Sequence, residues 1–438
     1  MCSVAEADFG DEGGKHTMLK DVALNAIEDE NCKKCNVDKC VIKLDFKEAM
    51  CLSCFLYYVR HKFRATLGSS KILNRQSDVL FDFKGTAADV CLLHMIKFAF
   101  EEETYKRLSF KLKLVFVDEN CTATTNTEDA LKNRMTKIQE IKDILQQFPS
   151  FTCCYSTIAD KIFDDISIIS REKVLALIES EKEFSSVYHS IDTLSSKQDF
   201  MEIMRKNALR DTAHHLNCSY IFLSDISVDL AKKLISNIAL GRGSSVSNDV
   251  GFLDDRISCI KIIRPLKDLN QHEVDSYVQF NNLKFCSFSN FSSNDNVASI
   301  QNLTSNFINQ LQKNCYNSTV STVYKCSNKI ASNNETISCQ NNTINSKMAR
   351  SYITDMNQRC LLCKSILDYH HSETLYAIEF SRCVSGQIAA NIEGMENLER
   401  IRESSENAKN SIENNRNKFL CHGCRNIFPE TNQENFIF

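Results

Sequence analysis

Closely spaced cysteine pairs are the residues of this sequence best placed to do chemistry. Two Cys-x-x-Cys pairs stand near the N-terminus, with fifteen residues between them: Cys32, Cys35, Cys51 and Cys54. Each turn places two thiolates so that they can share one tetrahedral ion, and the second pair completes the shell of a structural zinc site. Lys33 and Lys34 would help to keep the thiols ionised. The spacing predicts zinc here; the alternative is a set of pairs kept for packing alone, and Cys40 is expected to be a spare.

A second cysteine set lies near the end of the chain. Its members are Cys360, Cys363, Cys421 and Cys424. The two pairs are much farther apart than in the first set, but the entropic cost of closing a loop grows only with the logarithm of its length. A shared metal is therefore permitted, and the spacing leaves open whether it is bound. His422 and Cys383 are possible substitute ligands, although bystander residues are the simpler interpretation.

Basic and aromatic side chains alternate just after the first cysteine set. Four basic residues fall within five positions: Arg60, His61, Lys62 and Arg64. Tyr57, Tyr58 and Phe63 lie beside them. Cations bind the RNA backbone and aromatic rings stack on unpaired bases, so this segment is a candidate RNA contact. The alternative is a helix whose basic face is solvated or packs against a partner.

The composition places these residues in an ordinary globular chain. Hydrophobic residues make up 43% of the 438 residues, and the formal net charge is −4, so RNA binding would have to come from a local basic patch. No apolar run approaches the ~20 residues of a membrane span, and the acidic N-terminus does not resemble a signal peptide. We expect a cytoplasmic protein without membrane contact, whose 21 cysteines are metal ligands, catalytic thiols or buried small groups.

The elements that must position these residues alternate between strand and helix patterns. Strands are predicted at 78–83, 111–117, 220–223 and 258–263, and helices at 55–67, 87–108, 128–147, 198–217, 227–240, 270–280 and 300–311. Such alternation implies crossover units and a mostly parallel sheet. The predicted units are a polar tail (1–30), a cysteine module with a basic helix (31–68), an α/β domain (69–284), an Asn- and Ser-rich extension (285–358) and a C-terminal cysteine module with a charged insertion (359–438).

The loop after the first strand is the expected ligand site, because ligands bind at the carboxyl ends of parallel strands. This order of elements resembles the PP-loop ATPase superfamily, a Rossmann-like fold whose first loop reads Ser-Gly-Gly-x-Asp-Ser. The matching residues here run from Lys84, Gly85 and Thr86 to Asp89. One glycine remains and both serines are gone, which argues against ATP binding. Lys84 could still touch a phosphate, although an exposed loop lysine is the simpler interpretation.

Several further segments resemble one family, cytoplasmic tRNA 2-thiolation protein 2. They run in the family's order through most of residues 30–430 and comprise Arg60–Gly68, Ile238–Gly243, Arg264–Asp268 and Ser318–Tyr324, together with the terminal cysteine pairs. Arg242 and Arg264 follow the ends of a helix and a strand near the expected cleft. They are therefore candidate tRNA contacts, with a structural hydrogen bond to a carbonyl as the alternative.

The resemblance implies a subunit of a tRNA thiolation complex. It implies a heterodimer with an active PP-loop subunit, which transfers sulfur from a thiocarboxylated ubiquitin-like carrier to carbon 2 of the wobble uridine in tRNA for Lys, Glu and Gln. Active thiolases of this type carry a Cys-x-x-Cys before the fourth strand, but residues 195–217 contain no cysteine. We therefore expect no catalytic residues. The competing hypotheses are an ATP-dependent thiolase catalytic in its own right and, less favoured, a zinc interaction module.

Overall fold

The architecture rests on a computed structural model of the chain. It describes residues 31–44, 48–74, 76–102, 108–120, 127–159, 161–257, 259–286, 299–313, 317–326, 359–367 and 420–428. The predicted polar tail, most of the Asn- and Ser-rich extension, the charged insertion and Cys383 lie outside these described residues.

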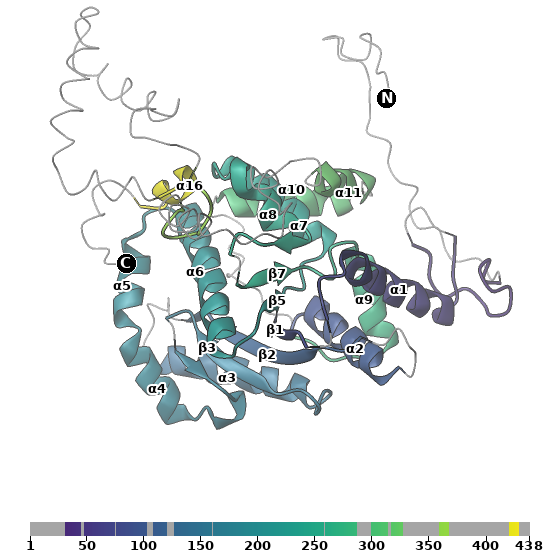
Figure 1. Cartoon of the computed structure of the whole chain (residues 1–438), viewed down its shortest axis with the longest axis horizontal. Helices are drawn as coiled ribbons and strands as arrows, with labels where there is room; N and C mark the ends of the chain where they lie inside the picture. The colour runs from purple at the N-terminus through teal and green to yellow at the C-terminus, as the bar shows by residue number, and fades with distance from the viewer. Residues whose placement is uncertain are drawn as a thin grey trace, which may run out of the picture.

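A seven-stranded sheet forms the centre of the molecule (Figure 1). Its strands are β1 (Asp78–Asp82), β2 (Lys111–Asp118), β3 (Cys153–Thr157), β4 (Ile162–Phe163), β5 (Tyr220–Phe222), β6 (Leu253–Asp254) and β7 (Lys261–Ile263). The spatial order is β4-β3-β2-β1-β5-β7-β6, in which the five inner strands are parallel and the two edge strands antiparallel. The predicted α/β class with a mostly parallel sheet is confirmed.

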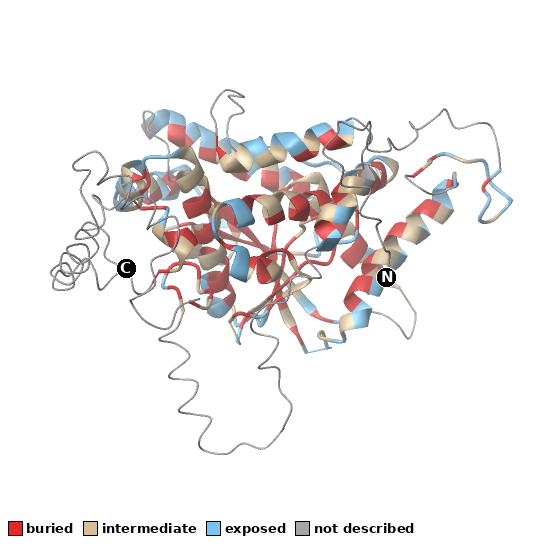
Figure 2. Cartoon of the chain, turned by 90° about the horizontal axis from the view of Figure 1, so that it is seen from above, coloured by how far each residue is buried: buried red, intermediate tan, exposed pale blue. Residues whose placement is uncertain are grey.

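The strands form because short apolar runs can be buried on both faces of a parallel sheet. Successive residues of β1 point to opposite sides, so Phe81 joins one hydrophobic cluster and Leu80 joins the other. The same division separates Phe116 from Val115 on β2. Two cores therefore lie back to back across the sheet, and Figure 2 shows the buried residues concentrated along the strands between the helices.

Helices cover both faces of the sheet. The described helices are α1 (Leu52–Ser70), α2 (Ala87–Glu101), α3 (Thr127–Leu145), α4 (Arg171–Ser180), α5 (Lys182–Ser190), α6 (Leu194–His215), α7 (Ser227–Ala239), α8 (Val246–Val250), α9 (Gln271–Phe280), α10 (Ile300–Lys313), α11 (Asn317–Cys326) and α16 (His422–Arg425), with short 3₁₀ turns at Ile166–Ile168 and Gly243–Ser245. Helices α2, α3, α7 and α9 contribute to one core, and α6 dominates the other. Among the described helices, none is long and apolar enough to cross a membrane.

The two cysteine modules lie at opposite ends of the longest axis (Figure 1). The N-terminal module leads directly into α1. The C-terminal module is built into the core on the α6 side, where Leu420, Ile427 and Phe428 cluster with Phe200 of α6. The rings of Phe200 and Phe428 pack edge to face with centroids 5.8 Å apart. The C-terminal module is thus part of the α/β domain's packing.

Candidate functional site

The N-terminal cysteines converge into one group, as their spacing predicts. The sulfur atoms of Cys32, Cys35, Cys51 and Cys54 all lie within 4.8 Å of one another. The Sγ atoms of Cys35 and Cys51 are 3.6 Å apart. A tetrahedral ion with metal–sulfur bonds of about 2.3 Å requires sulfur–sulfur edges of about 3.8 Å, so the geometry fits a four-thiolate metal site. Zinc is the ion this donor set favours, and an iron site is also compatible with four sulfurs.

The electrostatics of the N-terminal group also favour a cation. Backbone hydrogen bonding at Cys51 lowers the pKa of Cys32 to about 6, whereas burial raises the pKa of Cys54 to about 12. Four thiols this close cannot all ionise alone, because each thiolate repels the next. A bound dication removes the conflict by neutralising two of the four charges, and metal binding expels the remaining protons.

The C-terminal cysteines form an equivalent group despite their long separation in the chain. The sulfur atoms of Cys360, Cys363, Cys421 and Cys424 also lie within 4.8 Å of one another. The Sγ atoms of Cys363 and Cys421 are 3.6 Å apart, again close to the edge of a metal–sulfur tetrahedron. The ring of His422 packs against Gly241 instead, at the position that a Cβ there would occupy. The four cysteines therefore supply a complete donor set by themselves.

The loop after β1 is closed by a carboxylate of the chain itself. Asp89 is fully buried at the start of α2, and its Oδ2 atom accepts the backbone N–H groups of Lys84 and Thr86 at 3.0 and 2.9 Å. The Thr86 hydroxyl donates to the same oxygen at 2.8 Å, and Ser224 after β5 donates to Oδ1. Burial raises the pKa of Asp89, and these hydrogen bonds oppose the rise. The N–H groups that could hold a phosphate in such a loop are thus already occupied.

Ion pairs occupy the strand ends next to this loop. Because β1 lies between β2 and β5, the strand order reverses there, which is where a doubly wound sheet binds ligands. Asp82 ends β1 and pairs with Arg205 of α6 at 2.5 Å, and Arg205 also contacts Glu119. The Nζ atom of Lys84 lies 3.7 Å from Asp82. The charged side chains at these strand ends thus pair with one another.

Gly85 allows the loop to close tightly. Its backbone φ is +80°, and an added Cβ would come within 2.8 Å of Ile141 on α3. The carbonyl of Gly85 also accepts the N–H of Cys286 at 2.7 Å, so a later segment lies directly on the loop. Gly85 thus serves a compact, covered turn, and its origin in a phosphate-binding motif stays a prediction.

Three of the predicted tRNA-binding residues on α1 fasten that helix to the α/β domain. Lys62 pairs with the buried Glu273 of α9 at 2.8 Å, and Arg64 pairs with Glu102 after α2. The guanidinium of Arg60 lies 3.6 Å from the ring centroid of Phe98 and donates to the hydroxyl of Tyr277. Contact with tRNA stays a prediction for these residues, but their charged ends already have protein partners.

The fourth residue of that cluster has a different setting. His61 is exposed and stacks on Tyr57, with ring centroids 6.0 Å apart and 28° between the planes. Tyr57 has 63% of its surface exposed, and the Nζ atom of Lys34 lies 5.1 Å from its ring centroid. An exposed aromatic stack beside a cation is therefore present at the junction of the N-terminal cysteine module and α1.

Arg242 and Arg264 are buried inside the protein. Arg264 is fully buried and donates to the backbone carbonyls of Asn248 and Gly251 at 3.2 and 2.7 Å. This matches the structural alternative considered for both arginines. Arg242 contacts the sulfur of Cys424 and the carboxylate of Asp199. Contact of either arginine with tRNA stays a prediction, and neither guanidinium is presented at the surface.

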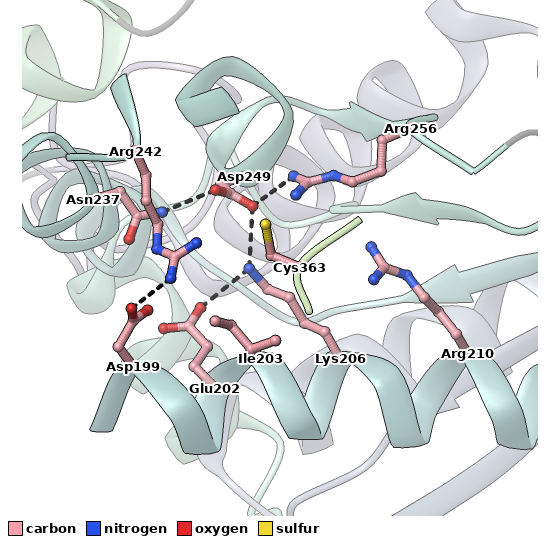
Figure 3. Close-up of a pocket in the computed structure, with 10 residues that line it drawn as sticks. All are labelled: Asp199, Glu202, Ile203, Lys206, Arg210, Asn237, Arg242, Asp249, Arg256 and Cys363. Atoms are coloured by element: carbon pink, nitrogen blue, oxygen red, sulfur yellow. Dashed lines mark hydrogen bonds and ion pairs between the residues drawn. The ribbon is translucent and has the colours of Figure 1, made fainter. Parts of the chain in front are cut away.

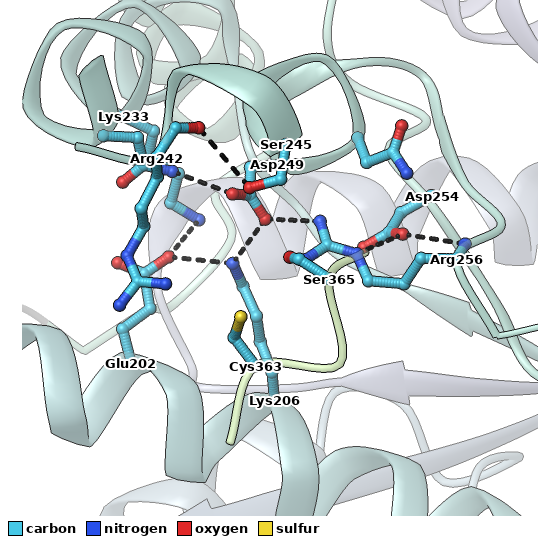
Figure 4. A network of polar contacts seen from close by, with 12 residues as sticks. Glu202, Lys206, Lys233, Arg242, Ser245, Asp249, Asp254, Arg256, Cys363 and Ser365 are labelled. Carbon is cyan, nitrogen blue, oxygen red and sulfur yellow. Dashed lines mark hydrogen bonds and ion pairs between the residues drawn. The ribbon is translucent and has the colours of Figure 1, made fainter. Parts of the chain in front are cut away.

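Sequence reasoning missed a buried polar network between α6, α7, α8 and the C-terminal cysteines. A small pocket there is lined by Asp199, Glu202, Ile203, Lys206, Arg210, Asn237, Arg242, Asp249, Arg256 and Cys363 (Figure 3). Asp249 is its centre and accepts from Arg256 at 2.6 Å and from Lys206 at 3.2 Å (Figure 4). Apart from Cys363, which belongs to a cysteine pair, and Arg242, which was a candidate tRNA contact, the sequence singles out none of these residues. By contrast, Thr86 and Asp89 form a capping box at the start of α2, a pattern that is readable from sequence.

Comparison with known proteins identifies the family. A curated relative from Anopheles gambiae named cytoplasmic tRNA 2-thiolation protein 2 is 38% identical, over 99% of this chain and all of that protein. The chain belongs to this family. A protein of the same name from Aedes aegypti is 36% identical over 98% of this chain and 99% of its own length. The membership inferred from scattered residues is therefore confirmed.

A family model matches one part of the chain, and a solved structure aligns with most of it. A model described as cytoplasmic tRNA 2-thiolation protein 2 matches residues 299–426, which hold α10, α11 and the C-terminal cysteines. Among solved structures, the U34-tRNA thiolase of Methanococcus maripaludis, determined with its 4Fe–4S cluster, is 15% identical. That alignment covers 74% of this chain and 96% of the thiolase, with a TM-score of 0.47.

Proposed function

We propose that this chain is a subunit without chemistry of its own in a cytoplasmic tRNA 2-thiolation complex. The family name supports the role in tRNA 2-thiolation. The observation that supports a non-catalytic part is the position of Asp89, whose carboxylate accepts the loop N–H groups that an ATP phosphate would need. A buried anion at that point also repels a phosphate.

The proposal extends to the partners. This chain forms a heterodimer with an active PP-loop subunit, which transfers sulfur from a thiocarboxylated ubiquitin-like carrier to the wobble uridine of tRNA for Lys, Glu and Gln. A partner with a closed nucleotide loop can add RNA-binding surface and stabilise the active subunit. Both cysteine groups hold structural zinc in this proposal, because four thiolates in a tetrahedron are a typical closed zinc site.

The tRNA surface of this subunit is proposed to include the Tyr57–His61 stack. A wobble uridine lies in a single-stranded loop, and unpaired bases stack on aromatic rings. Each base stacked on such a ring contributes about 1–3 kcal/mol. Lys34 beside Tyr57 would supply the contact to the backbone phosphate. The double variant Tyr57→Ala, His61→Ala should weaken tRNA binding by the complex about tenfold, measured by filter binding. Phe307→Ala, which truncates an exposed aromatic on α10, is the matched control and should leave binding unchanged.

A genetic test addresses the non-catalytic role. Cells lacking this chain should lose wobble 2-thiolation, measured by mass spectrometry of tRNA nucleosides. A version carrying Lys84→Ala should restore it fully, because the only cation of the loop is expected to do no chemistry. Failure of that version to restore thiolation, at normal protein level and normal pairing, would show that the loop acts on a phosphate.

A biochemical test addresses the alternative of an independent thiolase. The purified chain, incubated with ATP and unmodified tRNA, should release no pyrophosphate, while the reconstituted pair should release it. Pyrophosphate and thiolated uridine formed by the chain alone would reject the proposal in favour of the catalytic alternative.

A further inference from the structure

Within the part of the chain that the structure describes, a guanidinium lies against the sulfurs of the C-terminal cysteine group, and none lies against those of the N-terminal group. The Nη1 atom of Arg242 lies 3.4 Å from the Sγ of Cys424 and 3.9 Å from that of Cys421. Its Nη2 atom donates to Asp199 at 2.5 Å. Among the described residues, no guanidinium contacts the N-terminal sulfurs, where Ser53 lies 3.2 Å from Cys51.

Burial explains why the two groups differ. A dication held by four thiolates carries a net charge of −2, and burying such a charge is costly unless it is paired or hydrogen-bonded. Cys360, Cys363 and Cys424 are buried, so water cannot solvate most of that charge. Cys35 and Cys54 of the N-terminal group are partly exposed, so water can solvate part of the charge of that centre. The C-terminal centre therefore needs a protein cation.

Two glycines let the backbone around Arg242 fit against the cysteine turn. A Cβ on Gly423 would come within 2.7 Å of the Arg242 side chain. Gly241 adopts a φ of +79°, and a Cβ there would lie 2.5 Å from His422. Neither contact leaves room for a side chain, so the loop that ends α7 and the turn that carries Cys421 and Cys424 are shaped to each other.

Asp199 holds the guanidinium in this position. It lies in the first turns of α6, and both it and Arg242 are buried. Because the planar fork of arginine donates in two directions at once, one edge can meet the carboxylate while the other meets the sulfurs. Arg242 lies in the turn that follows α7, and Figure 3 shows its side chain pointing down towards Asp199.

We propose that Arg242, oriented by Asp199, is the hydrogen-bond donor that stabilises the metal-bound thiolates of the C-terminal centre. The arginine neutralises part of the buried charge, and its N–H groups hydrogen-bond to the sulfurs of Cys421 and Cys424 that would hold the metal. Partners of this kind typically contribute 10- to 100-fold to metal affinity. This role needs neither tRNA nor ATP, and it rests only on the part of the proposed function that places a metal in the C-terminal cysteine group.

The test is metal release from the full-length chain into an excess of a chromogenic zinc chelator. The wild-type chain should release two equivalents in two phases, and the double variant Cys32→Ser, Cys35→Ser identifies the N-terminal phase. Arg242→Met should accelerate the C-terminal phase about 10- to 100-fold and leave the N-terminal phase unchanged. Arg242→Lys, which keeps the charge but loses the fork, should fall between the two. Asp199→Asn should give a smaller acceleration.

A second readout separates thiolate stabilisation from mere packing. In the cobalt-substituted chain, the sulfur-to-metal charge-transfer bands of the C-terminal centre should shift in Arg242→Met, because the hydrogen bonds to sulfur are gone. The control Arg64→Gln, which removes an ion pair remote from the C-terminal sulfurs, should change neither rates nor bands. Unchanged release in Arg242→Met, equal acceleration of both phases, or a wild-type C-terminal group without metal would each overturn the proposal.

Discussion

Replacing Asp89 with alanine should open the loop after β1 and cost the local structure about 2–4 kcal/mol. The fully buried carboxylate accepts four hydrogen bonds, from two backbone N–H groups and the hydroxyls of Thr86 and Ser224. Hydrogen bonds to a charged group contribute about 1.5 kcal/mol each, or roughly 6 kcal/mol for four. The desolvation of a buried carboxylate, several kcal/mol, opposes this and leaves the smaller net value.

Hydrogen exchange of the peptide spanning residues 83–92 measures this change directly. A local loss of 2–4 kcal/mol corresponds to about 30- to 1000-fold faster exchange of the Lys84 and Thr86 N–H groups, because 1.4 kcal/mol is a factor of ten. Asp89→Asn is the matched control. It keeps one oxygen facing the loop and can donate to Ser224, so its exchange should rise by less than about tenfold.

Formate should partly rescue the alanine variant, because a small carboxylate can take the vacated place. At a concentration ten times its Kd, it would restore about 1.4 kcal/mol and slow exchange about tenfold. Chloride at equal ionic strength should not do so. If exchange in Asp89→Ala is no faster than in the native chain, or if chloride protects as well as formate, the carboxylate does not organise this loop.

Three further predictions concern buried charges. Glu273→Gln should loosen α1 by about 1–2 kcal/mol, because Lys62 loses its partner, and limited proteolysis between α1 and β1 should speed up. Arg134→Met should lower stability by about 3–5 kcal/mol in urea unfolding, because it leaves the buried Asp118 without its cation. Burial lowers the pKa of His94 to about 4. The native fold therefore resists protonating it and should lose about 1–2 kcal/mol, discounted for partial exposure, as pH falls from about 6.5 to about 4. His94→Gln should flatten that part of the stability curve relative to wild type.

One specific result would contradict each of these three predictions. Proteolysis of the Glu273→Gln chain at the native rate would mean that the ion pair does not hold α1. A loss below about 1 kcal/mol in Arg134→Met would mean that the buried carboxylates find other partners. An unchanged difference in stability between pH 7 and pH 5 in His94→Gln would assign the acid sensitivity to other groups.

Patterns within short stretches predicted most of the fold. The strands β1 and β2 were predictable because continuous apolar runs require burial on both faces. Strand β3, Cys153–Thr157, was missed because cysteine and hydroxyl side chains carry no strong apolar signal, although all five residues are buried. Helices α4 and α5 were missed as well, since no glycine or proline punctuates that stretch. The end of the predicted helix 87–108 was wrong, because α2 ends at Glu101 and the following Glu102 is extended.

In the candidate site, too, short sequence patterns revealed some residues and could not reveal the partners of others. Cysteine pairs are local motifs, so the members of both groups could be named from the sequence, although the long separation of the C-terminal pairs left a shared metal open. The partners of the basic residues were not predictable, because each lies far away in the chain: Arg242 is 43 residues from Asp199 and 182 residues from Cys424. The same side chains, arginine among them, serve RNA, carboxylates and metal thiolates alike, so residue type alone could not choose between these roles.

The placement of residues 420–428 in the α6-side core has a consequence for synthesis on the ribosome. Leu420, Ile427 and Phe428 share that core with residues of β1, β2 and β5, yet they are translated after every strand of the sheet. A nascent chain can form the hydrophobic core on the other face of the sheet early. Phe200 and the apolar side chains around it stay exposed to solvent until residues 420–428 have left the ribosome. Newly made chains should therefore depend on chaperones during that interval, and on available metal when residues 420–428 pack against the core.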